Sequence, residues 1–159
     1  MPEGVNHAAA GTDGKKLYVF GGRKRRNNPG PGFNFTQIYD PETNTWDSSS
    51  LPGSALQPLP APRGGMGKAV YIPEANAFLV FGGESNLEAG AFEGLNDLHV
   101  TDRIDIYLVD ENEWVLSSKT MDHARHGIYP VLFGDDVYVA GGGTKFRFSV
   151  SDIFSKYSV

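Results

Sequence analysis

The chain has 159 residues, a net charge of −5 and no cysteine, which excludes a disulfide, a thiolate metal site and a cysteine nucleophile. A hydrophobic content of 40% with 12% aromatic residues argues against disorder, and no apolar run is long enough to span a bilayer. The mild acidity indicates solubility rather than a particular partner, and neither a nucleic-acid nor a membrane partner is expected.

An apolar run that ends in a pair of glycines recurs along the chain. Each copy is rich in β-branched and aromatic residues, as buried strands are, and the glycines suit positive φ or close approach of a neighbour. The copies follow one another at a period of about 60 residues, so the chain contains an internal repeat. The three copies are Leu17 to Gly22, Phe78 to Gly83 and Asp136 to Gly143.

The same elements flank each glycine pair in the same order. A strand of small residues and a tight turn precede the apolar run, and a third strand that ends in tyrosine follows it. In two copies a turn then leads to tryptophan at a constant spacing, from Tyr39 to Trp46 and from Tyr107 to Trp114. Four antiparallel strands without helical periodicity predict a propeller blade. The predicted first strands are His7 to Ala10, Gly67 to Ile72 and Gly127 to Phe133, and the third strands are Thr36 to Tyr39, Arg103 to Tyr107 and Ile153 to Tyr157.

This combination resembles the kelch-repeat β-propellers, within the galactose-oxidase and kelch-like superfamily. The resemblance rests on the apolar run with its glycine pair, the tyrosine and tryptophan, and an arginine ahead of two repeats, Arg63 and Arg125. It implies an all-β chain in which residues 1–159 form kelch-type four-stranded antiparallel blades in an incomplete ring, with repeats at about 6–47, 61–116 and 123–159. A β-sandwich with accidental glycine pairs is the alternative.

The number of blades implies partners. At this repeat length the chain holds fewer than three complete blades, whereas closed propellers typically have about four to eight. We therefore expect about eleven strands, a third blade without its outermost strand, and either the remaining propeller blades or a homodimer partner. We also expect Tyr39, Trp46, Tyr107 and Trp114 to pack between blades.

Strand alternation predicts that one face of the propeller carries the long loops. The first and third turns of each blade share one end, and the second loop and the crossing to the next blade share the other. All the long segments belong to the second group, so we expect a ligand to bind on that face. These segments are residues 23–35, 48–62, 84–102 and 143–151.

Two sets of residues are candidates for ligand binding. Arg63 and Arg125 precede the innermost strands at the mouth of the channel, near His7 and His126, where they would suit a carboxylate, a phosphate or an acidic peptide. In the alternative interpretation, both arginines tie adjacent blades together. The second set is a basic loop, which is either a binding surface or a solvated face. It consists of Arg23, Lys24, Arg25 and Arg26.

No catalytic constellation, metal site or cofactor is predicted. The acidic segment 84–102 matches no calcium loop. The superfamily's radical copper oxidases need a tyrosine cross-linked to cysteine, which this chain lacks. The predicted function is a non-catalytic module that binds a protein or carbohydrate ligand, and the alternative is a fragment of a carbohydrate-active enzyme, an oxidase or a sugar mutarotase. No signal peptide is visible, so the compartment stays open: cytoplasmic by default, secreted if the natural N-terminus is longer.

Overall fold

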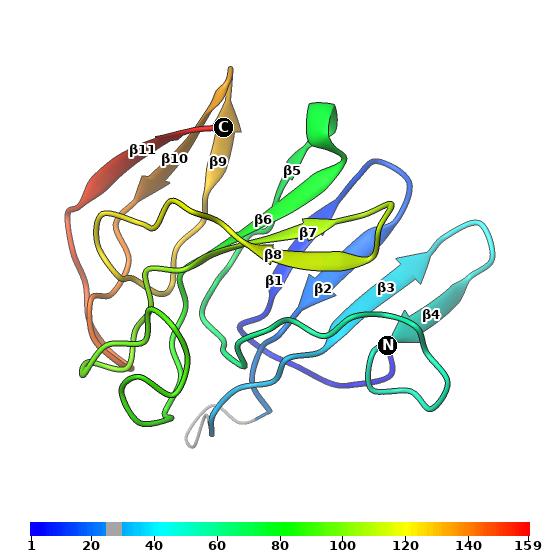
Figure 1. The fold of residues 1–159 in the computed structure, drawn as a ribbon, viewed down its shortest axis with the longest axis horizontal. Helices are drawn as coiled ribbons and strands as arrows, with labels where there is room; N and C mark the ends of the chain where they lie inside the picture. Colours follow the sequence, from blue (N-terminus) through cyan, green and yellow to red (C-terminus); the bar gives the residue numbers. More distant parts are fainter. Residues whose placement is uncertain (25–29) are drawn as a thin grey trace.

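Three antiparallel sheets follow one another along the chain in the computed structural model, which describes residues 1–24 and 30–159. In each sheet, strands that are neighbours in sequence are neighbours in space, so every blade is a simple meander (Figure 1). Within the described residues the only helical element is a single 3-10 turn, η1 (Pro73–Ala75), and no helix is long and apolar enough to cross a membrane. The prediction of an all-β fold built from consecutive blades is confirmed.

The strands of each blade are as follows. Blade 1 contains β1 (Ala9–Thr12), β2 (Leu17–Phe20), β3 (Thr36–Asp40) and β4 (Thr45–Ser48). Blade 2 contains β5 (Val70–Ile72), β6 (Ala77–Phe81), β7 (Ile104–Leu108) and β8 (Glu113–Leu116). Blade 3 contains β9 (Val131–Phe133), β10 (Asp136–Ala140) and β11 (Phe154–Ser158), and no described residue adds a fourth strand to it.

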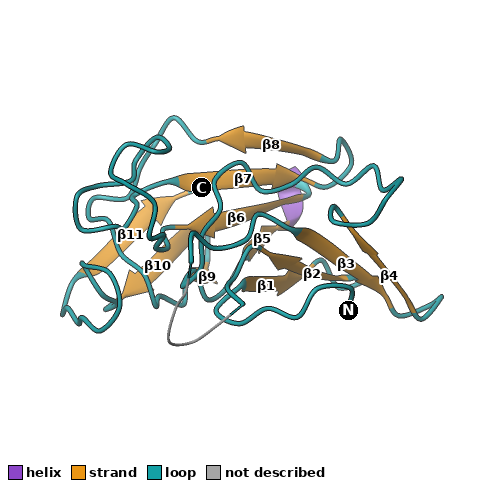
Figure 2. Cartoon of the chain, turned by 90° about the horizontal axis from the view of Figure 1, so that it is seen from below, coloured by secondary structure: helices purple, strands orange, loops and turns teal. Residues whose placement is uncertain are grey.

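The blades are arranged around a common centre. Figure 2 shows the inner strands β1, β5 and β9 gathered in the middle, while β4, β8 and β11 lie at the periphery. In Figure 1 the tight turns lie along the upper side and the long loops along the lower side. The structure therefore separates the two kinds of connection as strand alternation predicts.

The glycine pairs end the second strands and let neighbouring blades touch through their backbones. Gly21 and Gly22 have φ values of 61° and 103°, which side-chain-bearing residues rarely adopt. A Cβ on Gly21 would lie 2.7 Å from the carbonyl oxygen of Arg63, at the start of the next blade, and the N–H of Gly22 donates to that oxygen at 2.9 Å. The same contact repeats between Gly83 and Arg125, also at 2.9 Å. Positive φ and close approach are thus both needed at these pairs.

The inner strands begin later than predicted. The predicted first strand starts at His7, whereas β1 begins at Ala9. His7 has a φ of 56°, which interrupts the extended backbone, and the equivalent positions in the later repeats, Gly65 and Gly127, also have positive φ. The carbonyl of His7 accepts a hydrogen bond from the N–H of Gly65 at 2.7 Å, and the carbonyl of Gly65 accepts one from Gly127 at 2.6 Å. A chain of backbone hydrogen bonds therefore links the three blades just before their inner strands.

The hydrophobic core consists of two layers, one between each pair of neighbouring blades. Between blades 1 and 2, Phe20 packs against Tyr107 at 5.4 Å and against Trp114 at 5.0 Å between ring centroids. Packing between blades is therefore confirmed for Tyr107 and Trp114. Tyr39 and Trp46 instead pack on each other at 5.2 Å on the outer face of blade 1, where the described part of the chain places no further blade.

Candidate functional site

The long loops of the three blades contact one another on the loop face, the side of the molecule at the bottom of Figure 1. The hydroxyl of Ser85 in blade 2 donates to the carbonyl of Pro31 in blade 1 at 2.7 Å. The N–H of Phe146 in blade 3 donates to the carbonyl of Leu98 in blade 2 at 2.8 Å. Bonds between loops of different blades join them into one continuous surface.

A buried carboxylate, Glu84, connects the blades beneath this surface. Its side chain forms a short ion pair with Arg23 of blade 1, and its other oxygen accepts the backbone N–H of Arg147 in blade 3 at 2.7 Å. His126 approaches the same carboxylate, with Nδ1 at 3.5 Å, while its Nε2 lies 2.9 Å from the carbonyl oxygen of Lys145. All three charged or titratable side chains are buried. This network of Glu84, Arg23 and His126, called the Glu84 cluster below, connects segments of all three blades beneath the loop face.

Sequence reasoning treated Glu84 only as one of several acidic loop residues. A signal was nevertheless present, because Glu84 directly follows the second glycine pair, just as Arg23 follows the first. Both positions form isolated antiparallel bridges with the segment ahead of an inner strand, Arg23 with Asn6 and Glu84 with Gly64. Opposite charges at one repeat position in adjacent blades indicate an ion pair between those blades.

Arg63 is fully buried and bonded within blade 2. Its Nη2 lies 2.6 Å from Oδ2 of Asp105, its Nε donates to the carbonyl of Gly82 at 2.8 Å, and its Nη1 donates to the carbonyl of Ala61 at 3.0 Å. Asp105 also pairs with Arg103, whose Nη2 lies 2.6 Å from Oδ1. Burial raises the pKa of Asp105, but the two guanidinium groups outweigh it and hold that pKa below its usual range.

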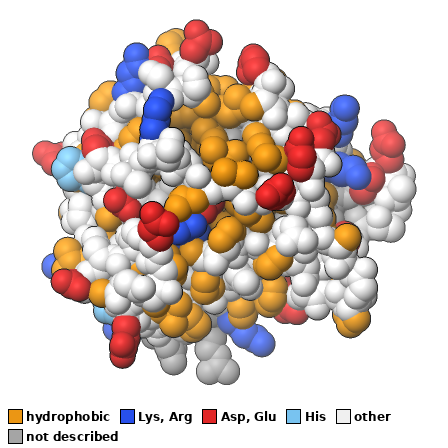
Figure 3. All heavy atoms as spheres, viewed as in Figure 1, with side chains coloured by type: hydrophobic (Ala, Val, Ile, Leu, Met, Phe, Trp, Pro, Cys, Tyr) orange, Lys and Arg blue, Asp and Glu red, His pale blue; other side chains and the backbone are white. Residues whose placement is uncertain are grey.

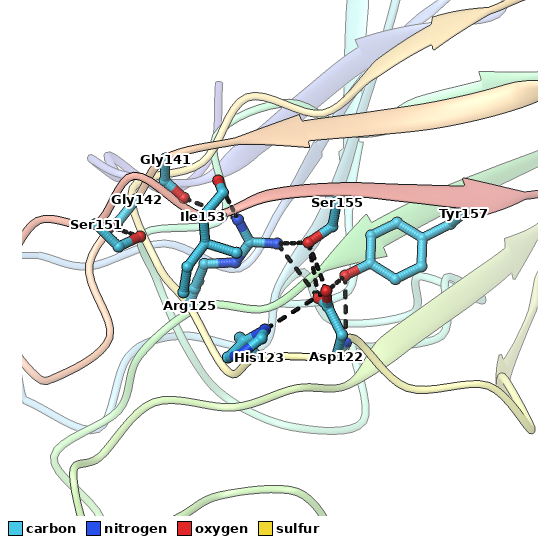
Figure 4. A network of polar contacts seen from close by, with 9 residues as sticks. All are labelled: Asp122, His123, Arg125, Gly141, Gly142, Ser151, Ile153, Ser155 and Tyr157. Atoms are coloured by element: carbon cyan, nitrogen blue, oxygen red, sulfur yellow. Dashed lines mark hydrogen bonds and ion pairs between the residues drawn. The ribbon is translucent and has the colours of Figure 1, made fainter.

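Arg125 occupies the same place in blade 3 with a different set of partners, which Figure 4 shows. Its Nη1 donates to the carbonyls of Gly141 and Ile153 at 3.0 and 3.1 Å, and its Nη2 donates to the hydroxyl of Ser155 at 2.8 Å. Ser155 stands at the repeat position of Asp105. The negative charge has moved to Asp122, 3.6 Å from Nη2.

Asp122 is the half-exposed acceptor of this second network. The hydroxyls of Ser155 and Tyr157 both donate to its carboxylate. Burial raises the pKa of Asp122, but these hydrogen bonds, with a further contact from His123, outweigh it and lower the pKa to about 2. The carboxylate is therefore ionised at neutral pH and compensates Arg125.

The predicted ring of ligand-binding groups is placed as follows. The donor atoms of Arg63 and Arg125 point into their own blades, so these side chains bond within a blade and not, as the alternative interpretation had it, between adjacent blades. His126 belongs to the buried Glu84 cluster, and His7 is exposed, with its Nδ1 2.6 Å from the side-chain oxygen of Asn6. A ligand-binding role for these four residues stays a prediction.

The predicted basic loop is divided by the structure. Arg23 is buried in the Glu84 cluster, so its charge does not add to a solvated basic surface. Lys24 is exposed, and Arg25 and Arg26 lie outside the described residues. In the part of the chain that the structure describes, no group of three or more acidic or histidine side chains has the geometry to hold a metal ion.

Exposed apolar side chains were the feature of the loop face that sequence reasoning missed. Phe148 is 93% exposed and Val150 is 90% exposed, both on the β10–β11 loop, and Leu98 of the β6–β7 loop is 52% exposed. The loops that carry them are joined by the bond between Phe146 and Leu98. These three residues are called the loop patch below.

Comparison with known protein families assigns the first repeat. Residues 5–50 match the family model described as the Kelch motif, a span that contains all four strands of blade 1. Blade 1 matches the kelch motif. Blades 2 and 3 repeat its strand order, glycine pair and tyrosine, so the three sheets are consistent with a partial kelch propeller. No curated protein matches the chain.

Proposed function

We propose that this kelch-repeat chain is a non-catalytic module that binds a protein ligand through its loop face. The observation that supports the proposal is the loop patch: Leu98, Phe148 and Val150 are exposed on loops that inter-blade bonds hold together. Kelch motifs are often used for protein binding, which agrees with this reading. Apolar anchors presented by a rigid scaffold are characteristic of protein interfaces.

Exposed charges of both signs lie around the loop patch, with the basic Lys145 and Arg147 on the β10–β11 loop that carries Phe148 and Val150. Glu88, Glu93 and Asp97 are exposed on the β6–β7 loop that carries Leu98. Charged rims around an apolar centre steer association and add selectivity, while the centre supplies most of the affinity. Leu98 and Val150 offer a sugar no hydrogen bond, and this favours a protein over the carbohydrate alternative.

The test is quantitative affinity capture with three forms of the chain. Wild type is compared with the double variant Phe148→Ser/Val150→Ser and with Phe133→Ser, a matched control that removes an exposed phenyl group from blade 3 outside the loop patch. We expect the same protein to be retained by wild type and the control and lost from the double variant. Equal retention by all three forms contradicts the proposal, as does glycan binding that only the double variant loses.

A further inference from the structure

The β10–β11 loop, which carries two of the three loop patch residues, is bound to the Glu84 cluster at two neighbouring positions. Oε2 of Glu84 accepts the backbone N–H of Arg147 at 2.7 Å, and Nε2 of His126 lies 2.9 Å from the carbonyl oxygen of Lys145. In Figure 3 hydrophobic side chains reach the surface at the lower left of the molecule, where Figure 1 draws this loop. Because Phe148 directly follows Arg147, the cluster contacts the loop immediately before its exposed apolar residues.

The backbone of Arg147 bends the loop at this contact. Its φ is 68°, in the left-handed region that residues with a Cβ rarely adopt. The side chain of Arg147 is exposed, and the hydrogen bond from its N–H to the buried carboxylate of Glu84 stabilises the bend. The direction in which the loop presents Phe148 therefore depends on Glu84.

Bonds within the loop fix its shape more than its placement. The N–H of Lys145 donates to the hydroxyl of Ser149 at 3.1 Å, and this hydroxyl donates back to the carbonyl of Lys145 at 2.7 Å. The bond from Phe146 to Leu98 joins the loop to another loop. His126 bonds the same Lys145 carbonyl from the buried side, so it connects the closed loop to the interior of the molecule.

Both ring nitrogens of His126 face hydrogen-bond acceptors. Nδ1 lies 3.5 Å from Oε1 of Glu84, and Nε2 faces the carbonyl of Lys145. A neutral imidazole carries one N–H and can donate to only one of these acceptors, whereas an imidazolium donates to both. Histidine is the side chain that ordinarily changes charge between about pH 5 and pH 8. Since 10% of the His126 side chain is exposed, its protons can exchange with solvent.

Glu84 is the carboxylate that pairs with His126. Arg23 faces it from the β2–β3 loop and pairs with the same oxygen, so protonation of His126 places one carboxylate between two cations. The segment ahead of β5 brings only the uncharged Gly65 against His126. The other nearby cations bond within their own blades or are exposed on the β10–β11 loop: Arg63 and Arg125 in the first group, Lys145 and Arg147 in the second.

We propose that Glu84 and His126 are positioning residues that hold the β10–β11 loop in the conformation that presents the loop patch, and that protonation of His126 strengthens this hold. The inference rests on the function proposed above, and both side chains are buried beneath the surface that the ligand would contact. When His126 is neutral, one of its two bonds is absent and the loop populates other conformations. A ligand that requires one conformation then binds more weakly, in proportion to the population of that conformation.

A single spin label measures the loop without a ligand. The chain has no cysteine, so Val150→Cys provides one attachment site, and Val150 is 90% exposed, so the label displaces no packed side chain. We expect electron paramagnetic resonance spectra to show an immobilised fraction at least about twofold larger at about pH 5.5 than at about pH 8. The same label on Thr43→Cys, in the exposed turn between β3 and β4, should give equal spectra at both pH values.

Substitutions assign the response of the Val150 label to His126. His126→Gln keeps an amide N–H for the carbonyl of Lys145 but does not titrate, so its immobilised fraction should be equal at both pH values and larger than that of His126→Ala. His123→Gln is the matched control, because it removes an exposed histidine outside the Glu84 cluster, and it should respond to pH as wild type does. Circular dichroism establishes that the variants are folded, and if His126→Ala is not, the pH response of His126→Gln decides.

Three results with the label would overturn the proposal: no pH response in wild type, a smaller immobilised fraction at the lower pH, or a full pH response in His126→Gln. Loss of the response in His99→Gln alone would overturn it as well, because the ring of His99 packs 5.7 Å from that of Phe146 and the effect would belong to that histidine.

The affinity for the protein retained in the capture experiment above, once purified, tests the consequence for binding. Wild type and His123→Gln should bind it about three- to tenfold more tightly at the lower pH, and His126→Gln equally at both. Equal affinity of wild type at both pH values, with the label response intact, would overturn the claim that the loop conformation sets the affinity. Failure of the loop patch to retain any protein, with the label response intact, would instead contradict the proposed function, so the two failures are distinguishable.

Discussion

Replacing Arg63 with glutamine tests whether the buried guanidinium holds blade 2 together. The substitution removes a charge-assisted bond to Asp105 and leaves the carbonyls of Gly82 and Ala61 without their donors. Each orphaned buried acceptor costs about 1–3 kcal/mol, and breaking a buried ion pair costs about 3–5 kcal/mol. Glutamine retains one donor group, and Arg103 still compensates Asp105. We therefore expect the free energy of unfolding to fall by about 3–4 kcal/mol.

Two further variants provide losses of unfolding free energy with which the loss for Arg63→Gln can be compared. Arg125→Gln should cost less, about 2 kcal/mol, because it orphans carbonyls but leaves a half-exposed carboxylate, Asp122, that water can solvate. Asp105→Asn should cost more than Arg63→Gln, because it leaves the buried cations Arg63 and Arg103 next to each other.

The assay is urea-induced unfolding at neutral pH, followed by circular dichroism and by tryptophan fluorescence. The order Asp105→Asn, Arg63→Gln, Arg125→Gln, from the largest loss to the smallest, is the expected result. A loss below about 1 kcal/mol for Arg63→Gln would refute the reasoning, because each buried carbonyl left without a donor should cost about 1–3 kcal/mol by itself.

Three other predictions follow from single residues. Trp114→Ala should lower the free energy of unfolding by about 3 kcal/mol and Trp46→Ala by only about 1 kcal/mol, because Trp114 packs between two blades and Trp46 on Tyr39 alone; equal losses in urea titrations would contradict this. His7→Gly should raise the thermal midpoint slightly, with a gain of about 0.5–1 kcal/mol, because it relieves a left-handed backbone; a lower midpoint would argue against strain there. The pKa of Asp122 is lowered to about 2, so its stabilising contribution is complete above the pKa of the unfolded chain and is lost as the pH falls towards 2. Asp122→Asn should flatten stability between pH 5 and about pH 2, and an unchanged slope would count against the network.

The blades were predictable because their signals are local and repeated. Glycine pairs at Gly21 and Gly82 recur with an apolar run before them, and only a backbone with positive φ and a close neighbour needs glycine at both positions. The exact start of the inner strands was not predictable from residue type. His7 carries a side chain at a left-handed position that glycine fills in the other repeats, and only its alignment with Gly65 reveals this.

The polar clusters were harder to predict, because they depend on which way side chains point across blades. Arg63 precedes an inner strand at the channel mouth, yet its guanidinium turns into its own blade to reach Asp105. In the third repeat the equivalent carboxylate is replaced by Ser155, and Asp122 on the crossing segment compensates Arg125 instead. In blade 3 the carboxylate that compensates the arginine thus comes from a different sequence position. The compensation of the buried charge is kept, but the repeated sequence pattern that would have predicted it is lost.

Self-association is the last prediction, and it follows from the two outer faces of the arc. Blade 3 exposes Phe133 at 76% and Phe154 at 66%, and blade 1 exposes Leu17, which is paired with Tyr39. By repeat position the first face corresponds to the side of blade 1 that meets blade 2, and the second corresponds to the side of blade 2 that meets blade 1. The two faces are therefore shaped to meet each other in different copies.

Exposed apolar faces of this kind promote association at micromolar concentrations. We expect light scattering to detect dimers or larger species of the chain at tens of micromolar, roughly the range in which such surfaces associate. Phe133→Glu should shift the chain towards the monomer, because it places a charge on the outer face of blade 3, while Lys15→Glu, in the exposed turn between β1 and β2, should not. A folded wild-type chain that stays monomeric at that concentration would show that these faces do not bind each other, and an equal effect of both variants would place the contact elsewhere.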